Sequence, residues 1–575
     1  MTMMRPTSRR RQGQSGVAII LLSLMLCTIL LPMIGLAFDL TIMYIVRAKL
    51  SAAVDAGVLA GGRSLIGSKT LAAQQTQVTN IALDFLNANM PAGYWGTTAT
   101  PTVETSTSNI VTQDTTNARI LVTLQASVKV PLVFLQYLQN TALVRSSAVA
   151  ARRYLRMVIV LDRSSSMETT AGGCTLGTNC PIDNLKSAVS NTDPNNPGFV
   201  QDFFEGQDDL GLVVFGGSGI VAYPPRDPTI VGGGGSGPDS NFKTIADPAI
   251  PDLVPLLKAG SNTGTSEGLI LAYKELQKNP QPLFYNVIVL FTDGMPNGFT
   301  AGWNGAAPSV LYSGDTGVVP TTLTSFIVSG GSQSTCTYKK YTDYTGGHQI
   351  VGWVSQWGGY ANEQDNLHGI YGSMSNNKFP SGAYSSPAQD VENWLATGDP
   401  AGTKEYLLDS TNDGGCYFRI GGSTQMIANS DVASFPAGDI YGNGLLGTDY
   451  KASLEYNLKG GFGLDSSDVN NPYQIGNVSW NAAYQAAKRI RGDTTLRPTF
   501  YVIGYNGLDS IDHALLKRIA NTNQGYQTWA QDPKGQYLQT DYDPTSTTGQ
   551  YYDAGPGGIA AAFQQVRSQI LSLAM

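Results

Sequence analysis

The stretch Met157–Met167, MVIVLDRSSSM, combines an apolar run of strand-forming residues with an aspartate and three serines. An unbroken run of Val, Ile and Leu is typical of a strand that is buried on both faces, as in a parallel sheet. The run stops at Asp162, and Ser164 and Ser166 follow at alternate positions. Open α/β sheets bind ligands at the carboxyl ends of their strands. The stretch therefore predicts an α/β domain with a polar site at the tip of this strand.

Two later stretches carry the same kinds of residue. AGSNTGTSEGLILAYKEL, Ala259–Leu276, contains Thr263, and NVIVLFTDGMPN, Asn286–Asn297, is a second apolar strand that ends at an acid, Asp293. A D-x-S-x-S string alone is weak evidence, because serine-rich loops and helix caps produce it by chance. Three elements in this order, two of them at strand ends, are much more specific. Together they resemble the metal-ion-dependent adhesion site of the von Willebrand factor type A domain.

This resemblance implies a bound Mg²⁺, or Mn²⁺ or Ca²⁺ in its place, with five metal-site residues: Asp162, Ser164, Ser166, Thr263 and Asp293. Mg²⁺ prefers six oxygens at about 2.0–2.1 Å. The three hydroxyls offer oxygen without charge, so only the two aspartates neutralise the ion, which can then accept a carboxylate from a protein partner. Thr265 is the alternative to Thr263. The competing interpretation makes the serines helix caps and Thr263 a turn residue.

The amino terminus predicts a membrane anchor. Residues 1–16 carry Arg5, Arg9, Arg10 and Arg11 without an acid, and Val17–Phe38 is an uncharged apolar run. A helix of this length crosses about 30 Å of hydrocarbon, and the arginines place the tail in the cytoplasm. The rest of the chain then lies outside the cytoplasm of a bacterial cell, as a single-pass membrane protein. A cleaved secretory signal is the alternative, although the run exceeds the roughly 7–15 residues of such signals.

The apolar run continues as AFDLTIMYIVRAKLSAAVDAGVLAGG, Ala37–Gly62, with helical spacing. With the arginine-rich start and Gly16, this region resembles the amino-terminal part of TadG-like proteins of the Tad/Flp pilus-assembly system. Related pilins carry a glutamate shortly after the processing glycine, and its absence after Gly16 argues against prepilin-peptidase cleavage there. Residues 39–154 are expected to form a small α+β stalk, with half-buried strands near Arg119–Leu138 and Ala142–Leu155. A mere spacer is the alternative.

The fold class predicted is α/β, a doubly wound, Rossmann-like type A domain in two parts, 155–298 and 477–575, interrupted by an insertion over 299–476. The second part alternates helix and strand patterns. The insertion is rich in Gly, Ser, Tyr and Asn and contains Trp303, Trp353, Trp357 and Trp394. We expect loops and short strands there. Because the insertion begins beside Asp293, we expect it to determine partner specificity; a small core of its own is the alternative.

The cysteines fit an extracytoplasmic compartment. Cys27 lies in the apolar span, which leaves two pairs for disulfides, Cys174–Cys180 and Cys336–Cys416. Zinc binding would require different spacing, since neither pair has the C-x-x-C form and the histidines His348, His368 and His513 are scattered.

Composition and motifs favour a binding protein. The 36 basic and 43 acidic residues give no basic surface for nucleic acid. The expected function is a membrane-anchored, extracytoplasmic pilus-assembly or adhesion protein whose partners are a protein with an acidic ligand, other pilus components and the membrane. A metal-dependent or serine hydrolase is the alternative. It lacks a G-x-S-x-G motif and a histidine close in sequence to the predicted metal residues, so we expect no enzyme.

Overall fold

The computed structural model describes residues 14–65, 71–97, 99–137, 139–168, 173–216, 219–224, 237–244, 248–259, 263–303, 320–328, 332–339, 350–355, 367–370, 417–418, 438–439, 443–444, 472–507, 511–523 and 542–574. The chain divides into two compact units. The first consists mainly of Met1–Leu65 and Lys69–Arg152, and the second of Arg153–Ala574.

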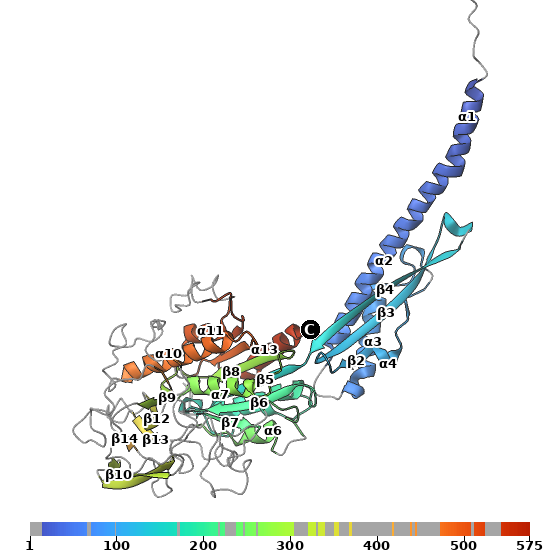
Figure 1. Ribbon diagram of the computed structural model, residues 1–575. Coiled ribbons are helices and arrows are strands. Elements are labelled where there is room, and N and C mark those ends of the chain that lie inside the picture. The colour runs from blue at the N-terminus through green and yellow to red at the C-terminus, as the bar shows by residue number, and fades with distance from the viewer. Residues whose placement is uncertain are drawn as a thin grey trace, which may run out of the picture. The chain divides into compact units, whose positions relative to one another are not determined.

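The first unit begins with a long apolar helix (Figure 1). It comprises α1 (Gln14–Met25), a π-helical turn (Leu26–Leu30) and α2 (Leu31–Arg63). The π turn ends two residues before Pro32, which lacks a backbone N–H and so removes one helical hydrogen bond. Among the described residues one helix, Ile19–Arg63, is long and apolar enough to cross a membrane.

The second half of α2 packs in the first unit through one stripe of side chains. The buried positions recur at helical spacing and include Ile42, Val46, Leu50, Ala53, Val54, Gly57, Val58 and Gly61. A Cβ at Gly57 would lie 2.7 Å from the Ala82 carbonyl oxygen of α3 (Leu71–Asn89), so only glycine allows this close approach of the two helices. The helix α3 was not predicted individually, because its sequence is rich in Gln, Thr and Asn.

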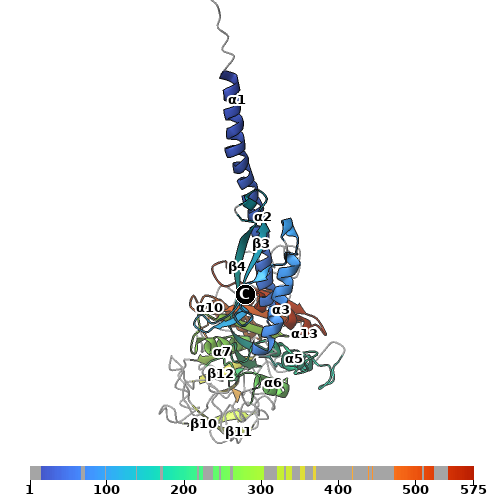
Figure 2. The ribbon, with the colours of Figure 1, turned by 90° about the vertical axis from the view of Figure 1, so that its right-hand side faces the viewer.

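An antiparallel sheet completes the first unit. Its strands are β1 (Thr102–Val103), β2 (Val111–Asp114), β3 (Arg119–Pro131) and β4 (Thr141–Arg153), in the order β1-β3-β2 with β4 paired to β3; the short α4 (Thr107–Ile110) precedes β2. The strands β3 and β4 lie where the alternating apolar pattern predicts strands. Their hairpin runs alongside α2 in both views (Figure 1, Figure 2).

A six-stranded sheet forms the centre of the second unit, in the order β16-β15-β8-β5-β6-β7. Its strands are β5 (Leu155–Asp162), β6 (Asp209–Phe215), β7 (Gly219–Tyr223), β8 (Tyr285–Thr292), β15 (Thr499–Tyr505) and β16 (Gln550–Ala554). All neighbouring pairs are parallel except β6 and β7, so β7 is an antiparallel edge strand.

Helices cover both faces of this sheet. Along β5, Met157, Ile159 and Leu161 pack in the cluster that contains α5 (Pro181–Ser190) and α13 (Ile559–Leu573). Val158 and Val160 point to the other face, which is covered by α7 (Thr265–Gln277), α10 (Pro472–Arg491) and α11 (His513–Ala520). This period of two, with both faces apolar, explains the unbroken apolar run of β5. The predicted doubly wound α/β fold is confirmed.

Short elements fill the connections: 3-10 turns at Ser165–Glu168, Phe199–Asp202 and Val254–Leu256, and the one-turn α6 (Ile250–Leu253). The 3-10 turn at Phe199–Asp202 does not continue into an α-helix. It stands between Gly198, the residue before the turn, and Gly206, whose φ of 85° is left-handed, so the chain leaves the helical conformation quickly.

Most of the described residues between Asp293 and α10 lie in short strands. β9 (Gly298–Trp303), β12 (Ile350–Ser355), β13 (Leu367–Ile370) and β14 (Tyr417–Phe418) form one antiparallel sheet in the order β14-β13-β12-β9, and β10 (Pro320–Val328) pairs with β11 (Ser332–Lys339). The expectation of short strands agrees with this. The predicted Cys336–Cys416 disulfide and the aromatic anchors of the insertion lie outside the described side chains.

Candidate metal site at the carboxyl edge of the sheet

The two predicted aspartates lie at the same edge of the sheet. β5 and β8 are neighbouring parallel strands with Leu161 opposite Phe291, so the chain leaves both strands on the same side. Asp162 is the last residue of β5, and Asp293 follows the last residue of β8. Both carboxylates are buried, with 0% and 3% of the residue exposed. The topology therefore brings together two acids that are far apart in sequence.

Hydrogen bonds fix the Asp162 carboxylate. Its Oδ1 accepts from the backbone N–H of Ser164 at 2.7 Å, and its Oδ2 accepts from the Thr292 hydroxyl at 2.5 Å. Burial raises the pKa of Asp162 to about 6, although these hydrogen bonds act in the opposite direction. A buried acid of this kind favours a nearby cation, because a cation compensates the cost of desolvating the charge.

The hydroxyls of Ser164 and Ser166 form a triangle of oxygens with Asp293. Ser164 Oγ and Ser166 Oγ are 2.9 Å apart, and they lie 3.2 Å and 2.8 Å from Asp293 Oδ1. Neighbouring ligands in an octahedron with metal–oxygen bonds of about 2.0–2.1 Å are about 2.9 Å apart. The three oxygens thus already have the spacing of one face of a Mg²⁺ coordination shell. Ser166 is partly exposed, so solvent reaches the cluster at this residue.

Thr263 joins the same cluster. Its backbone N–H donates to Asn297 Oδ1 at 2.7 Å, and the Asn297 N–H donates back to the Thr263 carbonyl at 3.1 Å. A Cβ at Gly294 would lie 3.5 Å from Thr263 Oγ1 and 3.7 Å from Ser166 Oγ, so both hydroxyls lie against Gly294. The alternative residue, Thr265, is the first residue of α7; its hydroxyl is buried and makes no hydrogen bond in the described structure.

Two residues that position the site were missed by the sequence analysis. Thr292 holds Asp162, and Asn297 holds the loop of Thr263. Both belong to the quoted stretch around Asp293, so the only signal in the sequence was their polar character immediately beside a strand end. A polar residue there is too common to be singled out without the spatial neighbours.

A disulfide follows the serine-containing turn. Cys174 and Cys180 are bonded, with their Cα atoms 5.0 Å apart, and Cys180 is the residue before α5. The bond closes a short loop between the turn Ser165–Glu168 and this helix. It lies in the same connection as Ser164 and Ser166.

The chemistry of the donors fits a hard divalent cation. The set contains two carboxylates and three hydroxyls, all oxygen, which suits Mg²⁺, Mn²⁺ or Ca²⁺ and not zinc. Among the described residues no group of three or more His, Cys, Asp or Glu could hold a metal ion. The cluster described above has only two carboxylates, and its other oxygens belong to hydroxyls.

Comparison with known families identifies the amino-terminal region. Residues 16–64 match the family described as "Tad: Putative Flp pilus-assembly TadE/G-like". The match covers α1 from Gly16 onward and all of α2, the region for which the sequence shows the resemblance. The search among curated proteins found no match.

Comparison with solved structures gives two pilus proteins. A point mutant of the PilB minor pilin from Streptococcus sanguinis is 14% identical, with a TM-score of 0.30; the comparison covers 82% of this chain and 78% of that one. The vWF domain of the type V pili tip protein Mfa5 from Porphyromonas gingivalis is 13% identical, with a TM-score of 0.31, over 74% of this chain and 98% of that one. Because these scores are low, we judge the fold from the strand order and the two covered faces of the sheet. The amino-terminal region of the chain is thus similar to the TadE/G-like family over residues 16–64, and a doubly wound α/β domain follows it.

Proposed function

We propose that this chain is a membrane-anchored, extracytoplasmic component of a Tad/Flp pilus system that binds a protein partner through a divalent cation in its type A domain. Val17–Phe38 serves as the anchor, and residues 1–16 lie in the cytoplasm. The cation is held by Asp162, Ser164, Ser166, Thr263 and Asp293. Mg²⁺ is the expected ion, with Mn²⁺ and Ca²⁺ as substitutes.

The observation that supports this proposal most strongly is the triangle of Ser164 Oγ, Ser166 Oγ and Asp293 Oδ1, with separations of 2.8–3.2 Å. A hydroxyl can donate a proton to a carboxylate or turn a lone pair toward a cation. A cation can therefore replace the hydroxyl–carboxylate hydrogen bonds without large movement of the chain. Since two carboxylates only balance the ion's charge, the ion keeps its attraction for an acidic group of a partner.

The hydrolase alternative has less support from these residues. Its serine would need a base, and His513, the histidine whose side chain is described, lies with Nδ1 2.6 Å from the Tyr551 hydroxyl. Ser164 and Ser166 instead hydrogen bond to Asp293. A binding role fits this arrangement better, because it needs only the cation and an open ligand position.

We assign partner recognition to the insertion of residues 299–476. The strand β9 begins at Gly298, directly after Asn297, the residue that holds Thr263. The insertion therefore leaves the fold beside the candidate cation site. Replacing residues 304–471 with a short Gly-Ser connection should preserve cation affinity and remove partner binding. Unchanged partner binding would show that the insertion plays no part in recognition.

Genetic complementation tests the function. In a strain that lacks this gene, the wild-type chain, Asp293→Ala and Asp553→Ala are expressed, with equal amounts in the membrane fraction checked by immunoblot. Asp553 is an exposed aspartate near the carboxyl end of β16. Like Asp293, it lies at the carboxyl edge of the sheet, but it is not part of the proposed cation site. Pili are counted by electron microscopy, and attachment to a surface is scored separately.

Asp293→Ala should fail to restore one of these traits, while Asp553→Ala restores both. Loss of pili with Asp293→Ala indicates a role in assembly, and normal pili with poor attachment indicate adhesion. Full rescue of both traits by Asp293→Ala would contradict the proposal.

A further inference from the structure

The tip of the β3–β4 hairpin is fastened to the long helix at the residue that follows the apolar span. Asp39 is completely buried, and its two carboxylate oxygens accept hydrogen bonds from three successive backbone N–H groups. Val133 N lies 2.9 Å from Oδ1, and Phe134 N and Leu135 N lie 3.0 Å and 2.8 Å from Oδ2. Burial raises the pKa of Asp39, but these three donors outweigh that effect and lower it. The tip is therefore held by the Asp39 carboxylate.

The tip also contacts the apolar span itself. The ring of Phe134 packs edge-on against Phe38, with ring centroids 5.8 Å apart. A Cβ at Gly35 would lie 2.6 Å from Phe134 Cβ and Cγ, so glycine is needed there for the ring to approach the helix. Gly35 and Phe38 both belong to Val17–Phe38. The hairpin tip thus lies beside the last turn of the segment that we assign to the membrane.

The tip is apolar and exposed. The sequence from Leu132 to Leu138 is LVFLQYL. Val133 is 49% exposed and Phe134 is 50% exposed, and the neighbouring helix exposes Ile34 and Phe38 by 55% and 47%. Because Phe134 contacts Phe38 and lies against Gly35, the exposed apolar side chains of the tip adjoin those of the span. Such a surface indicates contact with an apolar partner.

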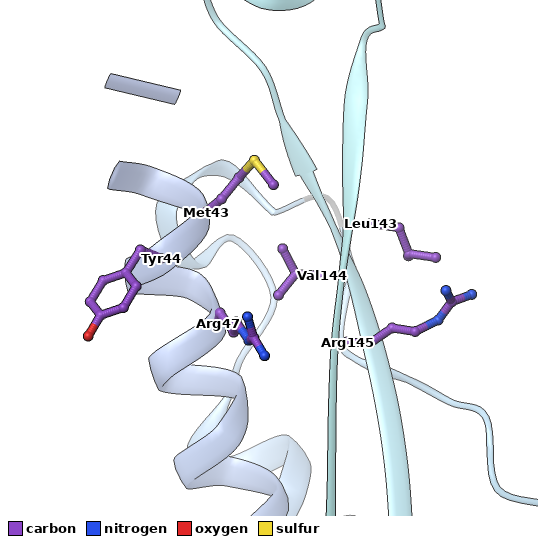
Figure 3. A pocket seen from close by; sticks show the side chains of 6 residues that line it. All are labelled: Met43, Tyr44, Arg47, Leu143, Val144 and Arg145. Carbon is purple, nitrogen blue, oxygen red and sulfur yellow. The ribbon is translucent and has the colours of Figure 1, made fainter. Parts of the chain in front are cut away.

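Tyr44 and Arg47 lie further along α2, beyond the end of the apolar span. Tyr44 is 74% exposed, and Arg47 makes no ion pair with the described residues. With Met43, Leu143, Val144 and Arg145 they line an open groove of about 280 Å³ between α2 and β4 (Figure 3). Arg145 is already paired with Glu104 at 2.9 Å.

The spacing along α2 matches the layers of a membrane interface. At 1.5 Å per residue, Tyr44 and Arg47 lie roughly 9 and 13 Å beyond Phe38. Helical side chains lean toward the amino terminus, and the long arginine side chain reaches back toward lipid phosphates. Tyrosine is enriched at this depth. With Val17–Phe38 in the bilayer, the apolar tip therefore lies at the depth of the acyl chains, Tyr44 at the depth of the interface and the Arg47 guanidinium at the depth of the headgroups.

We propose that the β3–β4 tip inserts into the extracytoplasmic face of the bilayer beside the spanning helix, as a second membrane contact of the stalk. Val133 and Phe134 contact lipid acyl chains, and Arg47 contacts lipid phosphates. The occupant of this surface is the lipid bilayer, because the surface continues that of the spanning helix. This inference rests on the proposed anchoring by Val17–Phe38.

Site-directed spin labelling of the full-length chain tests the insertion. A nitroxide is attached at Val133→Cys, in a chain whose Cys27, Cys336 and Cys416 are replaced by serine, after reconstitution into vesicles of phosphatidylethanolamine and phosphatidylglycerol. Val149→Cys is the matched control, since Val149 is an apolar residue of β4, 58% exposed and away from the tip. Collision rates are measured with oxygen, which concentrates in lipid, and with a nickel chelate, which stays in water.

The label at Val133 should collide more with oxygen than with nickel, and the label at Val149 should show the reverse. A label at Val133 that is fully accessible to nickel overturns the inference. A label shielded from both reagents also overturns it, because the tip would then be covered by protein. Carbonate extraction of the same vesicles distinguishes a failure of the anchor from a failure of the insertion. Release of the chain overturns anchoring by Val17–Phe38. A retained chain with a water-exposed tip overturns only the insertion.

A pair of helix variants adds a second test. Gly35→Leu should push Phe134 away and move the Val133 label toward the nickel reagent. Ala37→Leu, at an exposed position two residues along the same helix, should leave it unchanged. Equal behaviour of the two variants would show that the packing of Phe134 on Gly35 does not position the tip.

Discussion

Asp39 directly follows an apolar helix segment and Asp293 directly follows the buried strand β8, yet their surroundings differ. The oxygens of Asp39 are occupied by three backbone N–H groups, which can only donate. The carboxylate of Asp293 receives two serine hydroxyls, which can donate or accept. The first arrangement is closed and holds two parts of the chain together. The second can be rearranged around a cation. The donor type, more than the position of the acid, thus separates the structural Asp39 from Asp293, for which we propose a binding role.

The largest expected effect on stability comes from removing the hydrogen bonds of the Asp39 carboxylate. In Asp39→Asn, an NH2 group replaces one of the two accepting oxygens. At least one of the three backbone N–H groups of the tip then has no acceptor. Hydrogen bonds to a charged group contribute roughly 1.5–3 kcal/mol each, so we expect the free energy of local opening to fall by roughly 3 kcal/mol or more. Hydrogen exchange of the amides of residues 133–135 in the full-length chain measures this.

Asp55→Asn serves as the control for Asp39→Asn, because Asp55 is an exposed acid on the same helix. It should leave the exchange of these amides unchanged. Wild-type protection in Asp39→Asn would show that its carboxylate does not hold the tip, and the contrast between the two aspartates would disappear.

A smaller effect is expected from the disulfide beside the open arrangement. Cys174 and Cys180 are six positions apart, and closing a loop of that size stabilises a fold by roughly 2 kcal/mol in the chain-entropy description. Replacing both cysteines with serine should lower the free energy of unfolding of the type A domain by about this amount. Denaturant unfolding of the full-length chain in detergent measures the loss. Cys27→Ser, which removes an exposed free cysteine, should leave the free energy of unfolding unchanged. A loss as large as that of the double variant would show that the stabilisation does not come from the Cys174–Cys180 bond.

The smallest effect distinguishes the two threonines. Thr263→Val should weaken Mg²⁺ binding about tenfold, which corresponds to about 1.4 kcal/mol. Thr265→Val should leave the affinity unchanged and should not destabilise the fold, because the buried Thr265 hydroxyl has no hydrogen-bond partner to lose among the described residues. Isothermal titration calorimetry and thermal unfolding give both quantities. Weaker binding in Thr265→Val alone would exchange the roles of the two residues.

Where local patterns exist, the sequence predicted the strands and the positions of the acids at their ends. Asp162 and Asp293 end apolar runs, and the fold placed both at one edge because β5 and β8 are parallel neighbours. Ser164 and Ser166 followed from their spacing after Asp162. The amino-terminal helix was equally clear, because an uncharged apolar run of that length is typical of a membrane-spanning helix.

The sequence could not predict contacts that depend on distant residues. Asp39 stood out in no local pattern, since its partners are 94 to 96 positions away. The helix α3 was missed because polar Gln, Thr and Asn side chains weaken its apolar stripe. Thr292 and Asn297 gain their roles only from neighbours that the fold supplies.

The central claim is that a divalent cation binds at the carboxyl edge of the six-stranded sheet. Isothermal titration calorimetry of the full-length chain in detergent with MgCl₂ tests it most directly. The wild-type chain and Asp553→Ala should bind one ion with equal affinity. Asp293→Ala and Asp162→Ala should weaken binding by roughly 100-fold or more, with unchanged far-ultraviolet circular dichroism showing that the fold persists. Binding by Asp293→Ala and Asp162→Ala that equals that of the wild-type chain would contradict a cation site at the carboxyl edge of this sheet.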